Sequence, residues 1–135
     1  MKKVLFTLAM VLAFAVSASA ATQEVGPVTM DVPDGWTIQN QGPVGIVISP
    51  SQDAVLTVLS APSQGVDAKE IAENGSRAVN GSAPEADGDA WVFSFEKDGA
   101  NGVIRVSSHG DQAVVCTMLG ENPDLMKASR SVKLK

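Results

Sequence analysis

Val32-Pro33-Asp34-Gly35-Trp36 joins an alternating apolar stretch to everything that follows it, and we expect this turn to decide how the chain folds. Proline fixes its own φ near the value that a turn requires, and Asp34 can hydrogen-bond back to nearby amides. Gly35 accepts a positive φ, which a residue with a Cβ resists. The pattern on either side predicts that residues 25–32 form one strand and that Trp36 enters the next.

Upstream of this first strand, the sequence has the organisation of a secretory signal peptide. A basic pair, an apolar run and a cleavage site of small residues follow one another at residues 2–3, 4–16 and 17–20. We predict cleavage after Ala20, which leaves residues 21–135 as a single exported domain in the periplasm. A membrane anchor is the alternative, but an apolar run of about 13 residues is shorter than the roughly 20 that span a bilayer. No lipid-attachment cysteine follows the cleavage site, so we expect a free periplasmic protein.

Charge and composition limit the partners that this domain can have. The 135-residue chain contains ten Lys and Arg against 15 Asp and Glu, a net charge of −5. The signal peptide takes two lysines and no acidic residue with it, so residues 21–135 carry a net charge of −7. A negative domain without a basic stripe is not expected to bind nucleic acid or anionic lipid headgroups.

The chain has one cysteine, Cys116, so no intramolecular disulfide can stabilise it. Cys116 lies within the apolar segment 113–119, where cysteine usually behaves as a small buried hydrophobe. The alternative is a reactive or intermolecular thiol, which needs exposure and a neighbour that lowers its pKa. The local sequence supplies no such neighbour, and we predict burial.

Downstream of the turn, the hydrophobic pattern predicts an α+β domain. Further strands are expected at residues 36–38, 44–49, 54–61, 90–96, 103–108, 112–119 and 132–134. Residues 54–61 are apolar almost throughout, which predicts a central strand covered on both faces. Residues 90–119 read as a β-meander whose first strand turns its aromatic side chains inward.

Two helices are indicated by their capping residues. Asp67 can cap a main helix, with Glu70 three residues on, and Asn80-Gly81 ends it. Asn122 can cap a short helix that has Pro123 at its first position and runs over 124–130.

His109, the one histidine, is the natural candidate for catalysis, with Ser107, Ser108 and Asp111 beside it. However, neighbours along a strand point to opposite faces, and there is neither a G-x-S-x-G elbow nor a glycine-rich oxyanion loop. A solvated histidine in a His109-Gly110-Asp111 turn is the interpretation that we prefer. We therefore expect no catalytic residue and no enzyme activity.

Metal, cofactor and modification sites receive little support. Glu85, Asp87 and Asp89 place three carboxylates in a predicted loop, which is the ligand type that calcium prefers, but the spacing does not match a calcium-binding loop. We expect a solvated acidic turn and no bound metal. Nucleotide-binding glycine motifs are absent from the sequence, so no cofactor is expected. Asn74 and Asn80 match the glycosylation pattern, but they fit a helix face and a helix end better.

The order of these elements resembles the PsbP-like fold, a group that includes the PsbP photosystem subunit and bacterial envelope proteins of the DcrB type. The resemblance is carried by the Val32-Pro33-Asp34-Gly35-Trp36 turn, a hairpin through residues 44–61, the helix from Asp67, the Trp91-Val92-Phe93-Ser94-Phe95 strand and the short closing helix. It implies an antiparallel sheet flanked by helices, in proteins that act mainly as non-catalytic adaptors or accessory subunits. It supplies no functional motif from which a site residue could be transferred.

We therefore expect a non-enzymatic periplasmic accessory or adaptor protein with an envelope protein as its partner. The alternative is a small-ligand or metal-binding module. Such a module would use the space between the Asp67 helix and the sheet, or the acidic residues 85–89.

Overall fold

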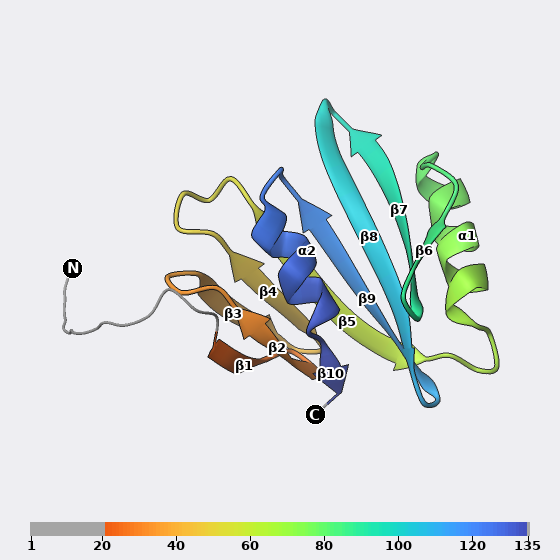
Figure 1. Ribbon diagram of the computed structural model, residues 1–135, viewed down its shortest axis with the longest axis horizontal. Helices are drawn as coiled ribbons and strands as arrows, with labels where there is room; N and C mark the ends of the chain where they lie inside the picture. The colour runs from red at the N-terminus through yellow and green to blue at the C-terminus, as the bar shows by residue number, and fades with distance from the viewer. Residues whose placement is uncertain (1–20, 135) are drawn as a thin grey trace.

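A computed structural model describes residues 21–134, which form an α+β domain of two antiparallel sheets and two helices (Figure 1). The large sheet has the strand order β3-β4-β5-β9-β8-β7-β6, and the small sheet has the order β1-β2-β10. The elements are β1 (Ala21–Val25), β2 (Val28–Val32), β3 (Thr37–Gln41), β4 (Val44–Ile48), β5 (Val55–Pro62), α1 (Ala68–Val79), β6 (Glu85–Asp87), β7 (Ala90–Lys97), β8 (Ala100–His109), β9 (Gln112–Leu119), α2 (Pro123–Arg130) and β10 (Lys133–Leu134). The predicted signal peptide, residues 1–20, lies outside the described residues.

The turn that links the two sheets has the expected geometry. The backbone N–H of Trp36 donates to the carbonyl of Pro33 at 3.3 Å, and Gly35 has a φ of +88°. A positive φ at the third position of a four-residue turn is the requirement that glycine meets. The chain then passes from β2 of the small sheet to β3 at the edge of the large one.

The prediction of one strand over residues 25–32 is wrong, because the chain reverses at Gly26-Pro27 and forms the hairpin β1–β2. Gly26 has a φ of +58° and donates its N–H to the side chain of Asn40 at 2.6 Å. Val25 and Val28 pair directly across the hairpin and are both fully buried. The two valines flank the turn directly, so the predicted strand ran through it, and the polar residues of β1 before Val25 gave no strand signal of their own.

One face of the large sheet is covered by α2 and the small sheet, as Figure 1 shows. Their apolar side chains meet those of β4, β5 and β9 in the main core, which contains Val25, Val28, Met30, Val32, Val47, Ala54, Leu56, Val58, Val114, Cys116, Met118, Leu125, Ala128 and Val132. Helix α1 packs on the opposite face, where Ala68 and Ala72 contact Phe93 of β7 and Val106 of β8. The expected inward aromatic face of β7 is thus confirmed at Phe93, and it faces α1.

The capping residues predicted the helices well. The side chain of Asp67 accepts from the N–H of Glu70 at 2.9 Å, and Asn80 ends α1 in the left-handed conformation. The side chain of Asn122 accepts from the N–H of Asp124 at 2.9 Å at the start of α2. Both sets of bonds satisfy amides that the first helical turn leaves without a partner.

Two expectations about strands need correction. Strand β5 is central, between β4 and β9, but it is not covered on both faces, since Leu59 is 39% exposed. Residues 85–87, interpreted as a loop, form the edge strand β6 and pair with Ala90, Trp91 and Val92 of β7. Both corrections affect the candidate sites described below.

Candidate functional site

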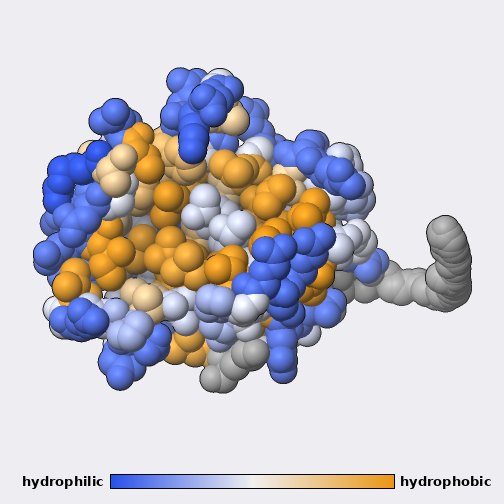
Figure 2. Space-filling view, turned by 180° about the vertical axis from the view of Figure 1, so that it is seen from behind, coloured by the Kyte–Doolittle hydropathy of each residue, from blue (hydrophilic) through white to orange (hydrophobic). Residues whose placement is uncertain are grey.

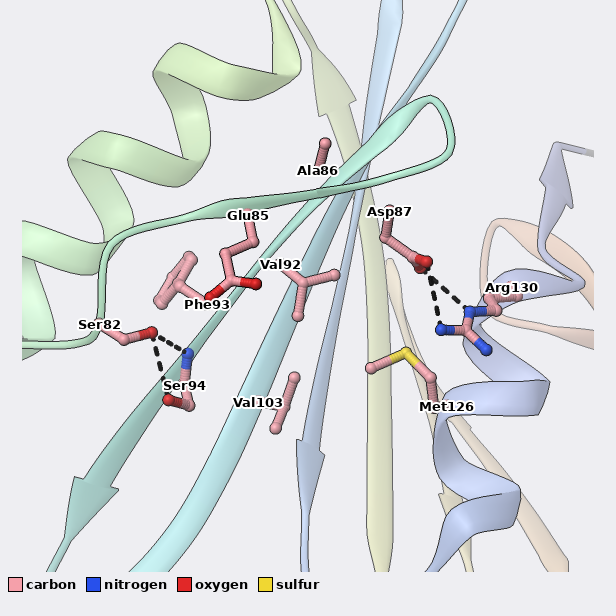
Figure 3. A pocket seen from close by; sticks show the side chains of 10 residues that line it. All are labelled: Ser82, Glu85, Ala86, Asp87, Val92, Phe93, Ser94, Val103, Met126 and Arg130. Atoms are coloured by element: carbon pink, nitrogen blue, oxygen red, sulfur yellow. Dashed lines mark hydrogen bonds and ion pairs between the residues drawn. The ribbon is translucent and has the colours of Figure 1, made fainter.

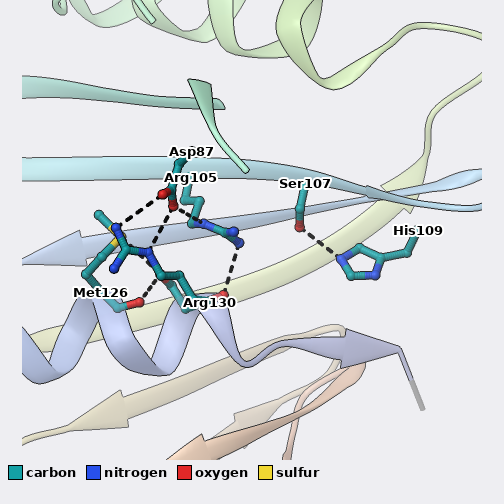
Figure 4. Close-up of polar contacts among 7 residues, drawn as sticks. Asp87, Arg105, Ser107, His109, Met126 and Arg130 are labelled. Atoms are coloured by element: carbon teal, nitrogen blue, oxygen red, sulfur yellow. Dashed lines mark hydrogen bonds and ion pairs between the residues drawn. The ribbon is translucent and has the colours of Figure 1, made fainter. Parts of the chain in front are cut away.

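An aspartate between two arginines is the most developed polar cluster in the described residues (Figure 4). Asp87 of β6 accepts from Nε of Arg105 on β8 at 3.0 Å and from Nε of Arg130 on α2 at 3.1 Å. A second bond joins Arg130 Nη2 to Asp87 at 3.2 Å, and Arg105 Nη1 donates to the carbonyl of Ser129 at 3.2 Å. Hydrogen bonds from Arg130 and then Arg105 hold the pKa of Asp87 below its ordinary value of 3.8. The cluster ties the edge strand, the sheet and α2 together.

A pocket of about 340 Å³ opens beside this cluster, between α2 and the sheet (Figure 3). Its polar lining includes Glu85, Asp87 and Arg130, and Met126 and Val92 supply apolar surface. It lies on the α2 side of the sheet, away from the space beside α1 that the ligand-binding hypothesis named first, but Glu85 and Asp87 of the acidic residues 85–89, its second location, line it. Asp87 and Arg130 already bind each other across it, so the pocket has few polar groups turned toward a ligand.

The acidic residues 85–89 do not converge as calcium ligands would. Glu85 and Asp87 lie on strand β6, Asp89 lies in the turn after it, and Asp87 is engaged by the two arginines. Residues 21–134 contain no group of three or more His, Cys, Asp or Glu side chains that could hold a metal ion. Because the Asp87 carboxylate is paired with Arg105 and Arg130, it holds elements of the fold together and is not free to bind a cation.

Ser107 and His109 form a pair that sequence reasoning missed. The Oγ of Ser107 lies 2.9 Å from Nε2 of His109, because residues two apart on strand β8 share a face (Figure 4). The sequence argument against catalysis considered immediate neighbours, and it holds for Ser108 only. A catalytic triad requires a carboxylate that orients the histidine ring. Within residues 21–134, His109 bonds to Ser107 and to no carboxylate. His109 itself ends strand β8, so it does not lie in the turn where it was expected.

Cys116 is buried in the main core, as predicted. Burial raises the pKa of its thiol to about 12, although the positive charge of Arg105 acts in the opposite direction. A thiolate is therefore scarce at neutral pH, and the side chain packs as a hydrophobe.

Part of the large sheet is uncovered, and Figure 2 shows it from behind as a broad hydrophobic area bordered by hydrophilic residues. Three cross-strand rows build it: Val44-Leu59-Val115, Ile46-Thr57-Thr117 and Ile48-Val55-Leu119. We call these nine residues the open face. None of the nine carries a charge, Leu59 and Leu119 are 39% and 40% exposed, and the other seven are partly exposed.

The open face exists because α1 covers only part of this face of the large sheet. Helix α1 packs on β7 and β8, and the apolar cluster beneath it reaches β9 at Val115, so in the described residues β4, β5 and most of β9 have no covering helix on this face. The alternate side chains of the same strands, including Val47, Leu56, Val58 and Cys116, are buried in the main core on the other face. Strands that are apolar on both faces therefore have only one face covered.

No helix in the described residues has the length and apolar character needed to cross a membrane.

Comparison with known proteins identifies the fold and nothing finer. No protein-family model and no curated protein matches this sequence. The solution structure of cyanobacterial PsbP (CyanoP) from Synechocystis sp. PCC 6803 superposes with a TM-score of 0.51 at 10% identity, over 89% of this chain and 95% of that one. A crystal structure from Bacteroides thetaiotaomicron VPI-5482 superposes with a TM-score of 0.59 at 14% identity, over 81% of this chain. This chain spans 45% of the length of the Bacteroides protein. The fold is PsbP-like, as the order of elements in the sequence suggested.

Proposed function

We propose that this protein is a non-enzymatic accessory protein of the bacterial envelope, which binds another protein through the open face. The single observation that supports the proposal is the uncharged open face itself, in which Leu59 on the middle strand is 39% exposed. The largest contiguous apolar surface of a soluble protein is often a functional one, and such surfaces, when bordered by polar residues, mark interaction sites. In this proposal, a partner protein covers the open face and removes its apolar side chains from water.

The periplasm is the proposed location, on the evidence of the signal-peptide pattern in residues 1–20. In this proposal, cleavage after Ala20 releases a single domain whose first strand, β1, begins at residue 21. Accessory rather than catalytic action is supported by the Asp87 cluster, whose charges bind one another, and by the Ser107–His109 pair, which has no orienting carboxylate among residues 21–134.

The proposal is tested by cross-linking the tagged protein in cells of its own host and recovering it from the envelope fraction. Leu59→Lys places a charge on the middle strand of the open face, and Gln23→Lys makes the same charge change at an exposed position on β1, on the other side of the large sheet. We expect a protein partner to be recovered with the wild type and with Gln23→Lys, and to be lost with Leu59→Lys. Equal recovery with both variants would show that the open face is not the binding surface.

A further inference from the structure

We infer that the open face receives an amphipathic α-helix of the partner protein, seated beside α1 and running along β5 and β9; this inference rests on the proposed function. The argument uses the dimensions of the open face, the side of α1 that borders it, and the area that other occupants would need.

The size of the open face matches one helix. It spans three strands, which at about 4.8 Å between strands gives a width of roughly 14 Å. Its three rows cover five residues of each strand, which gives it a length of roughly 17 Å. A helix with its side chains is about 10 to 12 Å wide, and one of 12 residues is about 18 Å long. The sheet already carries one such helix, because α1 has 12 residues.

The side of α1 that borders the open face is suited to a neighbouring helix. Lys69 and Ala78 are nine residues apart and so lie on opposite sides of α1. The Nζ of Lys69 lies 5.3 Å from the ring centroid of Trp91 on β7, which leaves Ala78 on the side away from that contact. Ile71, seven residues before Ala78, shares its side and packs with the cluster that reaches Ile104 and Val115.

Three of the four charged residues of α1 lie away from this side. At 100° per residue, Lys69, Glu73 and Arg77 are each about 100° or more around the helix from Ala78, whereas Glu70 is about 80° and the polar Asn74 about 40° from it. The wall that α1 forms beside the open face is therefore apolar at Ile71 and Ala78 and becomes polar at the exposed Asn74. Small side chains such as Ala78 allow two helices to approach to the 8–10 Å at which they pack.

A second copy of this chain fits less well. From the spacings given above, the open face covers roughly 240 Å² in projection, so a contact between two copies would have to extend well beyond it to bury the about 800 Å² per partner of a standard stable interface. A flat sheet from a second copy would also leave the apolar side of α1 uncovered or bring it against the polar Gln39 and Gln41 of β3. A single helix contacts the sheet and α1 together, as the helices of layered α/β folds do.

The test is photo-cross-linking in the native host with a benzophenone amino acid at Leu59 or, in a separate variant, at Val55. These positions lie four residues apart on the same face of β5, a separation of roughly 13 Å. Along a helix, 13 Å corresponds to about nine residues, and along a strand to about four. We expect the two cross-linked sites in the partner to be seven to eleven residues apart in a segment with apolar residues at helical spacing. Sites two to four residues apart, or a cross-link to a second copy of this chain, would overturn the helix.

A second pair of variants separates failure of this inference from failure of the proposed function. Ala78→Trp fills the side of α1 that borders the open face, and Arg77→Trp places the same ring about 100° around the helix from it; both positions are exposed, so folding is preserved. We expect Ala78→Trp to lower recovery of the cross-linked partner at least tenfold and Arg77→Trp to leave it within twofold. A partner that Leu59→Lys abolishes and Ala78→Trp leaves unchanged contradicts the helix and retains the accessory function. Unchanged recovery of the partner with Leu59→Lys would contradict both the helix and the proposed function.

Discussion

At the scale of single residues, Asp87 is the ionisable group whose bonds hold strands β6 and β8 and helix α2 together. It accepts from Arg105, whose side chain is 12% exposed, and from Arg130, which is 54% exposed. Replacement by Asn removes the charge and leaves the better buried Arg105 without its anionic partner, a loss that is costly in partly buried pairs. We expect Asp87→Asn to lower the free energy of unfolding at pH 7 by about 1–2 kcal/mol, measured by urea denaturation. Asp89→Asn, at an exposed neighbouring position, is the control and is expected to change stability by less than about 0.5 kcal/mol.

The same aspartate gives a prediction about pH. Its pKa is lower in the folded protein than its ordinary value of 3.8, so the ionised form stabilises the fold above that value. The contribution is lost as the pH falls through the lowered pKa of the folded state. The stability difference between wild type and Asp87→Asn should therefore shrink between pH 5 and pH 2, as measured by urea denaturation at each pH. A difference that stays constant over this range would show that Asp87 contributes nothing through its charge.

Cys116 provides an independent check of the core. A thiol that is buried and has a pKa of about 12 should react with a disulfide reagent at pH 8 only when the protein unfolds. We expect the reaction rate of the native protein to be at least a hundredfold below that of the urea-unfolded chain. Rapid reaction of the folded protein would mean that β9 is exposed on both faces.

The sequence predicted the chemistry of single residues only where neighbours along the chain determine it. The burial of Cys116 followed from the apolar residues on either side of it. The bonds of Asp87 to Arg105 and Arg130 join residues 18 and 43 positions away, which no local pattern contains. The Ser107–His109 contact could have been predicted from the sequence, because two residues of one strand share a face when they are two positions apart.

At the scale of elements, the small sheet depends on one close backbone approach. A Cβ on Gly45 of β4 would lie 2.5 Å from Cγ1 of Val25 and 2.6 Å from the backbone nitrogen of Gly26. The β1–β2 hairpin would have to move away from β4 to admit it. We expect Gly45→Ala to lower the free energy of unfolding by about 2–3 kcal/mol, the upper range for overpacking, measured by thermal or urea denaturation.

Gly42→Ala is the matched control for this substitution. Gly42 has a φ of +62° and open space around it, so alanine there costs only the strain of the left-handed conformation, about 1 kcal/mol. If the two substitutions destabilised the protein equally, the contact between the small sheet and β4 would not be as close as described.

Elements with strong local signals were predicted correctly, and elements without them were not. Helix α1 was located from Asp67 and Asn80, and the β7–β8–β9 meander from its alternation. Strand β6 was missed because its three residues are mostly acidic and it is stabilised by pairing with β7 and by Arg105 and Arg130. Strand β1 was missed because its three middle residues, Thr22, Gln23 and Glu24, are polar. Only Val25 carried an apolar signal, and it was joined to the strand that follows Gly26-Pro27.

At the scale of the whole molecule, the open face is the feature that sequence could not predict. The apolar character of residues 54–61 correctly indicated two apolar faces for β5, but not that α1 would cover only β7 and β8. Coverage depends on where a helix lies over a sheet, which is a property of topology. A periodic pattern specifies which side chains share a face, and it does not specify what lies above them.

An uncovered apolar face should be detectable in the isolated protein. We expect the folded wild type to enhance the fluorescence of the dye ANS at pH 7, and Leu59→Lys to reduce this enhancement at least twofold. Leu59→Lys should change the free energy of unfolding by less than about 1 kcal/mol, because the side chain is partly exposed. Gln23→Lys should bind the dye as the wild type does. No dye binding by the folded wild type would argue against an accessible apolar surface.

Native mass spectrometry of the protein recovered gently from its own host tests the central claim most directly, with the wild type and Leu59→Lys measured side by side. The account predicts a wild-type complex containing one copy of this chain and a different polypeptide, and a Leu59→Lys chain that is found alone. The same complex in both samples, or a wild-type protein present only as a pair of identical chains, would contradict the claim that the open face binds a protein partner.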